Sequence, residues 1–114
     1  MKSKAIVAVC GGIAAYKAPD IVSALRKNDI HVTVMQTPNS ENFVTPASLE
    51  VIADVYVNHE WGKPKHIDVT ENLTVNDMFI VVPATANTIA KISHGFGDNL
   101  ITDTALALPK DVHR

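Results

Sequence analysis

The sequence predicts an α/β protein with three layers, in which helices cover both faces of a parallel sheet. Two apolar runs with β-branched residues, Ala5–Val9 and Met78–Val82, have the length and composition of strands that are buried on both faces. Segments with helical spacing alternate with the strand segments, which implies right-handed crossovers between parallel strands. The length of 114 residues suits one domain, residues 1–114, around one core.

Glycine, proline and short polar residues mark where the predicted elements begin and end. Pro19 is expected in the first regular turn of the first helix, after a looser turn. Gly95 is expected to stop the penultimate helix, and Asp98 to cap the last helix at its N-terminus. The expected elements are, in order, a strand at Ala5–Val9, a helix from Ala14 to the stop at Asn28–Asp29, a strand at His31–Met35, a turn at Thr37–Ser40, a short helix at Pro46–Ala53, an edge strand at Val55–Val57, a strand at Met78–Val82, a helix at Thr88–Ser93 and a helix with Ile101, Ala105 and Leu108 on one face.

Composition and charge exclude several functional classes. The chain is 46% hydrophobic and 19% charged, as expected of a globular protein. Its net charge of −2 comes without a basic patch, so we expect no nucleic-acid partner. Its apolar runs are far shorter than the roughly 20 residues of a membrane helix, so we expect no membrane partner. The single cysteine, Cys10, suits a reducing, cytoplasmic compartment, and no residues have the spacing of metal ligands.

Two loops that follow predicted strands are candidate binding segments. Parallel strands place such loops at one edge of the sheet, where open α/β sheets bind ligands. In the first loop, Gly11 and Gly12, followed by Ile13, let the backbone approach a ligand, although such glycines also serve ordinary turns. In the second loop, Thr37 and Ser40 offer hydroxyl groups beside backbone donors. This loop suits a phosphate or, alternatively, a simple turn.

A third loop follows the strand at Met78–Val82 and leads into a helix. Its small residues leave room for a flat ring, and Thr85, Asn87 and Thr88 supply hydrogen-bond donors and acceptors. Helix capping by Thr85 or Asn87 is the alternative, and it is compatible with ligand binding. The candidate residues of this loop are Pro83, Ala84, Thr85, Ala86, Asn87 and Thr88.

Few side chains are candidates for acid–base or nucleophilic chemistry. His66, in the segment His-Ile-Asp, is the preferred histidine, and an ordinary surface residue is the alternative. Cys10 at a strand end is more simply a small buried residue than a nucleophile. The segment Met35–Thr37 has no acidic residue to bind a ribose, so a nicotinamide dinucleotide domain fits poorly.

Four segments together resemble the flavin-containing cysteine decarboxylases. This family includes an enzyme of coenzyme A synthesis and the decarboxylases that modify lantibiotic peptides. The segment PATANTIAKISHGFGDNLITDTALA resembles the family's flavin-binding signature, and HIDV resembles the segment with its catalytic histidine. Flavin prenyltransferases share the architecture but resemble these two segments less. The other two segments are GGIAAYKAPDIVSALRK and TPNSENFVTPASLEVIA, so the resemblance covers nearly the whole chain.

The resemblance implies a flavodoxin-like or Rossmann-like sheet with bound FMN, and a homotrimer or higher oligomer with the flavin between subunits. It implies that the cysteine end of a small-molecule substrate is oxidised toward a thioaldehyde before carbon dioxide is lost, with His66 as the acid/base. FMN is expected rather than FAD because the second loop suits a terminal phosphate. The implied cofactor-binding residues are Gly11, Gly12, Ile13, Thr37, Ser40, Phe43, Pro83, Ala84, Thr85, Ala86, Asn87, Thr88, Asp98 and Asn99.

One departure from the family affects the expected activity. The family continues into a strand and a Pro-x-Met-Asn-x-x-Met segment associated with the substrate carboxylate, whereas this chain stops at Pro109–Arg114. We therefore expect a sheet that is incomplete at the C-terminus, as in a fragment, a split gene product or a degenerate paralogue. The 114-residue form is expected to be oligomeric or poorly soluble, without turnover of a cysteine-ended substrate.

Three functions remain open on the sequence alone. Decarboxylation of 4'-phosphopantothenoylcysteine to 4'-phosphopantetheine is the leading activity that the resemblance implies. Oxidative decarboxylation of a peptidyl cysteine is the first alternative, because the residues around His66 do not decide the substrate. A flavin-binding or regulatory module without turnover is the second.

Overall fold

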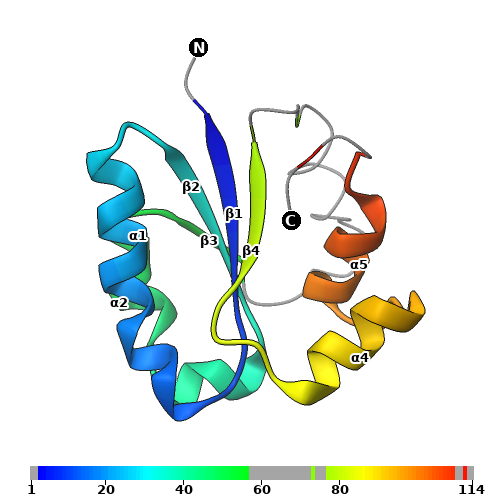
Figure 1. The fold of residues 1–114 in the computed structure, drawn as a ribbon. Coiled ribbons are helices and arrows are strands. Elements are labelled where there is room, and N and C mark those ends of the chain that lie inside the picture. The colour runs from blue at the N-terminus through cyan, green and yellow to red at the C-terminus, as the bar shows by residue number, and fades with distance from the viewer. Residues whose placement is uncertain (1–2, 57–72, 74–76, 110–111, 113–114) are drawn as a thin grey trace.

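The strands form one parallel sheet within the computed structural model, which describes residues 3–56, 73, 77–109 and 112 (Figure 1). β1 pairs in parallel with both β2 and β4, and β2 pairs in parallel with β3. Val7 stands in register with Val34 of β2 and with Ile80 of β4. The sheet order is β3-β2-β1-β4, with β1 at Lys4–Val9, β2 at His31–Gln36, β3 at Asp54–Tyr56 and β4 at Met78–Val81. The predicted parallel α/β class is confirmed.

Helices cover both faces of this sheet (Figure 1). The α-helices are α1 at Ala18–Lys27, α2 at Pro46–Glu50, α4 at Ala86–His94 and α5 at Leu100–Ala107. The short 3-10 helices η1 at Ile13–Lys17 and η2 at Pro38–Asn42 follow β1 and β2. α1 and α2 lie on one face of the sheet, and α4 and α5 lie on the other, so the predicted three layers are confirmed. No helix within the described ranges is long and apolar enough to cross a membrane.

The helix ends follow local chemistry, with one correction to the sequence prediction. Pro19 lies in the first turn of α1 after the 3-10 turn of η1, as predicted. Gly95 ends α4 with a φ of 75°, a left-handed conformation that favours glycine. The cap of α5 is Asn99 and not Asp98, because the Asn99 side chain accepts a hydrogen bond from the Thr102 amide.

The short helix α2 ends three residues earlier than the sequence pattern predicts. The amides of Ile52 and Ala53 both donate to the carbonyl of Leu49, at 3.0 and 2.9 Å. These two bonds form a final turn after α2, and β3 begins directly after this turn, at Asp54. The predicted edge strand therefore begins one residue earlier, and Val57 lies outside the described residues.

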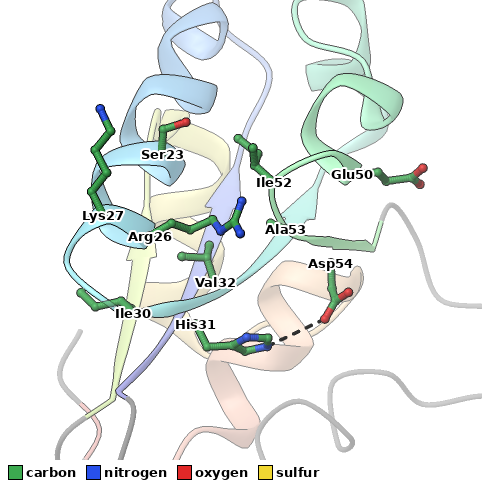
Figure 2. A pocket seen from close by; sticks show the side chains of 10 residues that line it. All are labelled: Ser23, Arg26, Lys27, Ile30, His31, Val32, Glu50, Ile52, Ala53 and Asp54. Carbon is green, nitrogen blue, oxygen red and sulfur yellow. Dashed lines mark ion pairs between the residues drawn. The ribbon is translucent and has the colours of Figure 1, made fainter.

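An open hollow of about 580 Å³ lies at the N-terminal ends of β2 and β3 (Figure 2). α1 contributes Arg26 and Lys27 to its lining, and Glu50 lies on the opposite side. His31 Nε2 and Asp54 Oδ2 are 3.8 Å apart, and both side chains are more than half exposed. Charges of both signs in contact with water indicate a solvated surface hollow more than an enclosed site.

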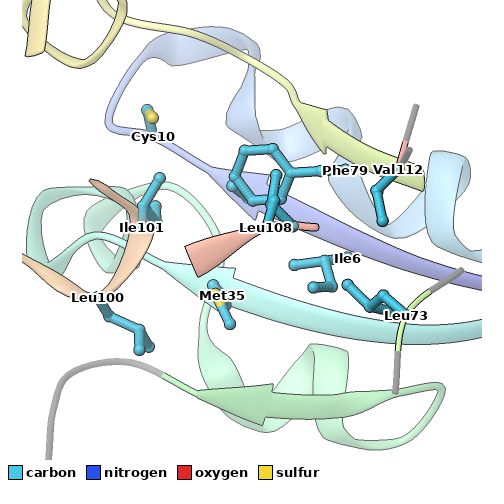
Figure 3. Packing of buried hydrophobic residues seen from close by; sticks show 10 residues of the cluster. Ile6, Cys10, Met35, Leu73, Phe79, Leu100, Ile101, Leu108 and Val112 are labelled. Carbon is cyan, nitrogen blue, oxygen red and sulfur yellow. The ribbon is translucent and has the colours of Figure 1, made fainter. Parts of the chain in front are cut away.

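Apolar side chains fill the space on each side of the sheet. Between the sheet and α5, Ile6, Met35 and Phe79 pack with Ile101 and Leu108 (Figure 3). The predicted apolar face of the last helix is therefore confirmed, with Ala105 partly buried against the same cluster. On the other face, the cluster consists of Val7, Val9, Ala15, Ala18, Val22, Val32, Val34, Val44 and Leu49. Because β1 is buried on both faces, close packing fixes its position. The loop that follows β1 therefore starts from a fixed point.

Candidate functional site

The loops after β1, β2 and β4 converge around a cavity of about 430 Å³ at the C-terminal edge of the sheet. This convergence is what the sequence pattern predicts for parallel strands. The lining carries amide and hydroxyl groups but no formally charged side chain. It consists of Gly11, Thr37, Pro38, Asn39, Thr85, Asn87, Thr88 and Asn99.

Gly11 lets the first two loops approach each other closely. A Cβ atom at Gly11 would lie 2.9 Å from both Cβ and Cγ of Asn39, and closer still to Nδ2 of the Asn39 side chain. Real Cβ atoms do not approach other atoms so closely, so only glycine fits without movement of the neighbouring loop. Gly12 differs, because a Cβ there would meet only Pro83 Cγ, at 3.9 Å.

The loop after β2 directs Thr37 and Ser40 differently. Thr37 lines the cavity, and its hydroxyl oxygen accepts a hydrogen bond from the Ser40 amide at 3.3 Å. Ser40 is fully buried, and its hydroxyl donates to the Thr37 carbonyl at 2.7 Å. The Ser40 hydroxyl therefore supports the loop from within and does not line the cavity.

The N-terminus of α4 brings three protic side chains together. Thr85 caps the helix by accepting a hydrogen bond from the Thr88 amide at 3.2 Å. The buried Cys10 thiol donates to Thr88 Oγ1 at 3.4 Å, and Thr85 Oγ1 lies 3.0 Å from the same oxygen. These two contacts use the protons of Cys10 and Thr85, and neither contact uses the hydroxyl proton of Thr88. The first amides of α4 add further donors, since helix N-termini leave such groups unpaired.

Asp98 and Asn99 join α4 to α5. Asp98 Oδ2 accepts a hydrogen bond from Lys91 Nζ at 2.6 Å, and this bond lowers the pKa of the Asp98 carboxyl below its usual value. Asn99 Oδ1 accepts from the Thr102 amide at 3.0 Å, and Asn99 Nδ2 donates to Asp98 Oδ1 at 3.3 Å. Asn99 lines the cavity, whereas the Asp98 carboxylate is occupied with Lys91 and Thr102 outside it.

The cavity gathers some of the predicted cofactor-binding residues but not all. The predicted residues that line it are Gly11, Thr37, Thr85, Asn87, Thr88 and Asn99. The predicted residues outside its lining are Gly12, Ile13, Ser40, Phe43, Pro83, Ala84, Ala86 and Asp98. Ile13 and Phe43 are exposed, at 80% and 42%. The predicted acid/base, His66, lies outside the described residues.

Pro38 and Asn39 line the cavity although neither was singled out as a binding residue. Both belong to the Thr37–Ser40 loop, so the loop prediction contained the signal. Within that loop, the sequence prediction takes only the residues with hydroxyl groups as binding residues, so it leaves out Pro38 and Asn39. The sequence does not show in which direction a side chain of a 3-10 turn points. Among the described residues, no cluster of three or more His, Cys, Asp or Glu side chains could hold a metal ion.

The model of the flavoprotein family matches residues 1–112. The chain belongs to the flavoprotein family. This flavoprotein is 41% identical to the "Probable phosphopantothenoylcysteine decarboxylase" of Streptococcus mutans, over 98% of its own length and 64% of that protein. It is 33% identical to the "Coenzyme A biosynthesis bifunctional protein CoaBC" of Escherichia coli K12, over 96% of its length and 28% of that protein. The chain thus spans less than two thirds of either relative.

Solved structures of cysteine decarboxylases share the fold of this flavoprotein. The peptidyl-cysteine decarboxylase EpiD superimposes with a TM-score of 0.80 at 28% identity, covering 98% of this chain and 68% of the other. A PPC decarboxylase mutant complexed with pantothenoylaminoethenethiol superimposes with a TM-score of 0.77 at 25% identity, covering 95% and 62%. The predicted resemblance to the flavin-containing cysteine decarboxylases is therefore confirmed.

Proposed function

We propose that residues 1–114 form one FMN-binding domain of a decarboxylase that acts on a cysteine-ended small molecule. The observation that carries this proposal is the uncharged, donor-rich cavity at the loops after β1, β2 and β4 of a flavoprotein-family sheet. Phosphopantothenoylcysteine is the proposed substrate, in agreement with the name of the Streptococcus relative and with its 41% identity. The proposed product is 4'-phosphopantetheine.

The cavity has the chemistry that FMN requires. The hydroxyl groups of Thr37, Thr85 and Thr88 line it, and the N-terminus of α4 adds a partial positive charge. Anions bind well to such sets of backbone and side-chain donors. The close approach of Gly11 to Asn39 provides a narrow cradle that any side chain at Gly11 would fill. We assign these residues to FMN, with Asn99 at the α5 side of the cavity.

The remaining predicted residues have supporting parts in this proposal. Ser40 holds the loop that carries Thr37, and Asp98 holds Asn99. The predicted residues at the exposed rim and in the third loop would lie close to bound FMN or to a neighbouring subunit, as the family resemblance implies. They are Gly12, Ile13, Phe43, Pro83, Ala84 and Ala86.

When bound, FMN would accept electrons from the cysteine end of the substrate and, after carbon dioxide is lost, would return them to give 4'-phosphopantetheine. The chain's own residues bind and orient the two molecules. His66 is proposed to move a proton at the reacting end of the substrate, because an imidazole titrates near neutral pH.

Two further parts of the proposal concern the oligomeric state and the cellular location of the enzyme. We propose a homotrimer or a higher oligomer, because Ile13, Tyr16 and Phe43 are exposed apolar side chains that a second copy would cover. We also propose a cytoplasmic location, in agreement with a buried, unpaired Cys10 thiol.

A peptidyl cysteine is the second candidate substrate. The similarity to EpiD, at 28% identity and a TM-score of 0.80, favours it. Both candidates end in a cysteine carboxylate and differ in the group that precedes it. Competition between the two substrates is the appropriate assay, because it measures the effect of that group directly.

Mass spectrometry of the released ligand and carbon dioxide release together test the proposed function. The purified chain is expected to be yellow and to release FMN. In a version extended to the length of the Streptococcus relative, phosphopantothenoylcysteine is expected to yield carbon dioxide faster than a peptide with a C-terminal cysteine. Bound FMN without turnover of either substrate would support a flavin-binding module, and a nicotinamide dinucleotide as the only released ligand would refute the proposal.

Changing His66 to Asn separates proton transfer from cofactor binding. In a full-length version, the variant is expected to keep the flavin absorbance of the parent and to lose about 10²–10⁴-fold in rate, the usual contribution of a general acid or base. His59→Asn, a second histidine in the same part of the sequence, is the matched control. A His66→Asn variant within a factor of a few of the parent would make His66 an ordinary surface residue.

A further inference from the structure

Gln36 is a fully buried carboxamide at the last position of β2, and it does not line the proposed FMN cavity. Its Nε2 donates two hydrogen bonds, to Ser40 Oγ at 3.2 Å and to the Val44 carbonyl at 3.0 Å. Its Oε1 is also buried but has no hydrogen-bond partner. The side chain therefore uses both of its protons and leaves its acceptor unsatisfied.

These two bonds fix the segment 37–44, which we call the β2–α2 loop. The Ser40 hydroxyl receives one bond from Gln36 and donates to the Thr37 carbonyl at 2.7 Å. The Val44 amide donates to the Ser40 carbonyl at 3.1 Å. The bond from Gln36 to the Val44 carbonyl therefore holds the C-terminal end of the loop. The outer side of the same loop carries Thr37 and Asn39 into the cavity.

Stability alone does not account for a glutamine at this position. A buried acceptor without a partner is destabilising, and a partly satisfied polar group is less favourable than an apolar side chain of the same shape. Methionine has a similar length and no such acceptor. The Gln36 carboxamide therefore orders the β2–α2 loop through two hydrogen bonds while its own acceptor stays unsatisfied.

The direction of the side chain points to the same role. In dinucleotide-binding sheets, the residue at the end of the second strand reaches outward to the ribose of the ligand. Here the equivalent side chain turns inward and bonds to its own loop. Gln36 acts on a ligand only through the residues that it holds in place.

We infer that Gln36 is a positioning residue that holds the β2–α2 loop in the conformation that binds the phosphate end of the flavin. The inference rests on the proposed function, because the inference assumes that the cavity binds FMN and assigns the β2–α2 loop to the phosphate of that FMN. It requires that loss of the carboxamide weakens phosphate recognition while the fold stays intact.

The test compares FMN with riboflavin, which lacks the phosphate, in wild type and in Gln36→Met. We expect FMN affinity to fall by about tenfold or more, the size of one lost bond to a charged group. We expect riboflavin affinity to change by less than about threefold. The urea midpoint of unfolding is expected to fall, because the buried Val44 carbonyl loses its donor, and the ratio of the two affinities separates this loss from the effect on phosphate binding. Ile6→Val, a change in the core cluster on the other face of the sheet, is the control for simple destabilisation. It should leave the ratio of the two affinities unchanged.

A second measurement needs no ligand. In ligand-free Gln36→Met, the amides of Ser40 and Val44 should exchange with solvent about tenfold faster than in wild type, while the amide of Val7 in β1 stays protected. If Gln36→Met does not fold, Ser40→Ala removes one of the two bonds and should shift the FMN-to-riboflavin ratio in the same direction.

Two results would overturn the inference: an equal loss of FMN and riboflavin affinity, or unchanged exchange at Ser40 and Val44. If wild type binds neither flavin, the proposed function fails, and the exchange measurement alone decides whether Gln36 positions the loop.

Discussion

Replacing Gly11 by alanine should separate the two loops that form the cavity. The new Cβ would lie 2.9 Å from Asn39 Cβ, an atom that moves only with its backbone. Overpacking of this kind costs about 1–3 kcal/mol. Loss of chain entropy in the unfolded state offsets about 0.4–1 kcal/mol of that cost. We therefore expect Gly11→Ala to lower the free energy of unfolding by up to about 2.6 kcal/mol. FMN binding should weaken by about tenfold, which corresponds to about 1.4 kcal/mol.

Two sets of variants make this prediction specific. Gly12→Ala is the matched control, because its Cβ would meet only Pro83 Cγ at 3.9 Å and the backbone there is extended. It should be neutral or slightly stabilising. In the background of Gly11→Ala, Asn39→Gly should relieve the clash and recover part of the lost free energy of unfolding, whereas Asn39→Ala should not, because alanine keeps the clashing Cβ.

Urea unfolding and fluorescence titration with FMN measure the two effects. The reasoning about close approach would be refuted if Gly11→Ala matched wild type in both measurements. Equal damage from Gly12→Ala would refute it as well.

Three further predictions concern other parts of the fold. Thr85→Ala and Thr45→Ala each remove a helix cap and should each cost about 1 kcal/mol in urea unfolding, but only Thr85→Ala should also weaken FMN binding. The lowered pKa of Asp98 means that its bond to Lys91 stabilises the fold above about pH 3.8 and is lost as the pH falls below that value. The difference in stability between wild type and Asp98→Asn should therefore shrink in acid, and a constant difference would contradict this assignment. Ile101→Ala should lower the free energy of unfolding by about 2–5 kcal/mol, measured by circular dichroism, while the folded fraction binds FMN normally.

Backbone periodicity made much of the fold predictable from the sequence. The apolar run at Ala5–Val9 identified the central strand β1, because a strand buried on both faces needs apolar residues at every position. The run at Met78–Val82 identified β4, but β4 lies at the edge of the described sheet and only Phe79 in it is buried, so its apolar run did not mark a central strand. Gly95 marked a helix end because a left-handed residue favours glycine. The cap of α5 was assigned one residue too early, because Asp98 and Asn99 are both good caps and only the geometry chooses between them.

The site was less predictable than the fold, for a physical reason. Sequence reasoning found the three loops, since their positions follow from the ends of parallel strands. It could not assign side-chain direction within them. Ser40 and Asn39 are neighbours in one 3-10 turn, yet Ser40 is buried and Asn39 lines the cavity. The role of Gln36 depends on two bonds within a tertiary structure, and no local pattern reports such bonds.

The walls of the cavity come from four places in the chain, at Gly11, at 37–39, at 85–88 and at Asn99. A ligand bound in this cavity would contact all four segments and would therefore recognise the assembled sheet. By mass action, a ligand that binds only the folded state stabilises it by about 2.7 kcal/mol at a concentration of 100 times its Kd. For a domain of ordinary stability, this is a large share of the total. The supply of cofactor and the folded population of this chain are therefore thermodynamically linked quantities.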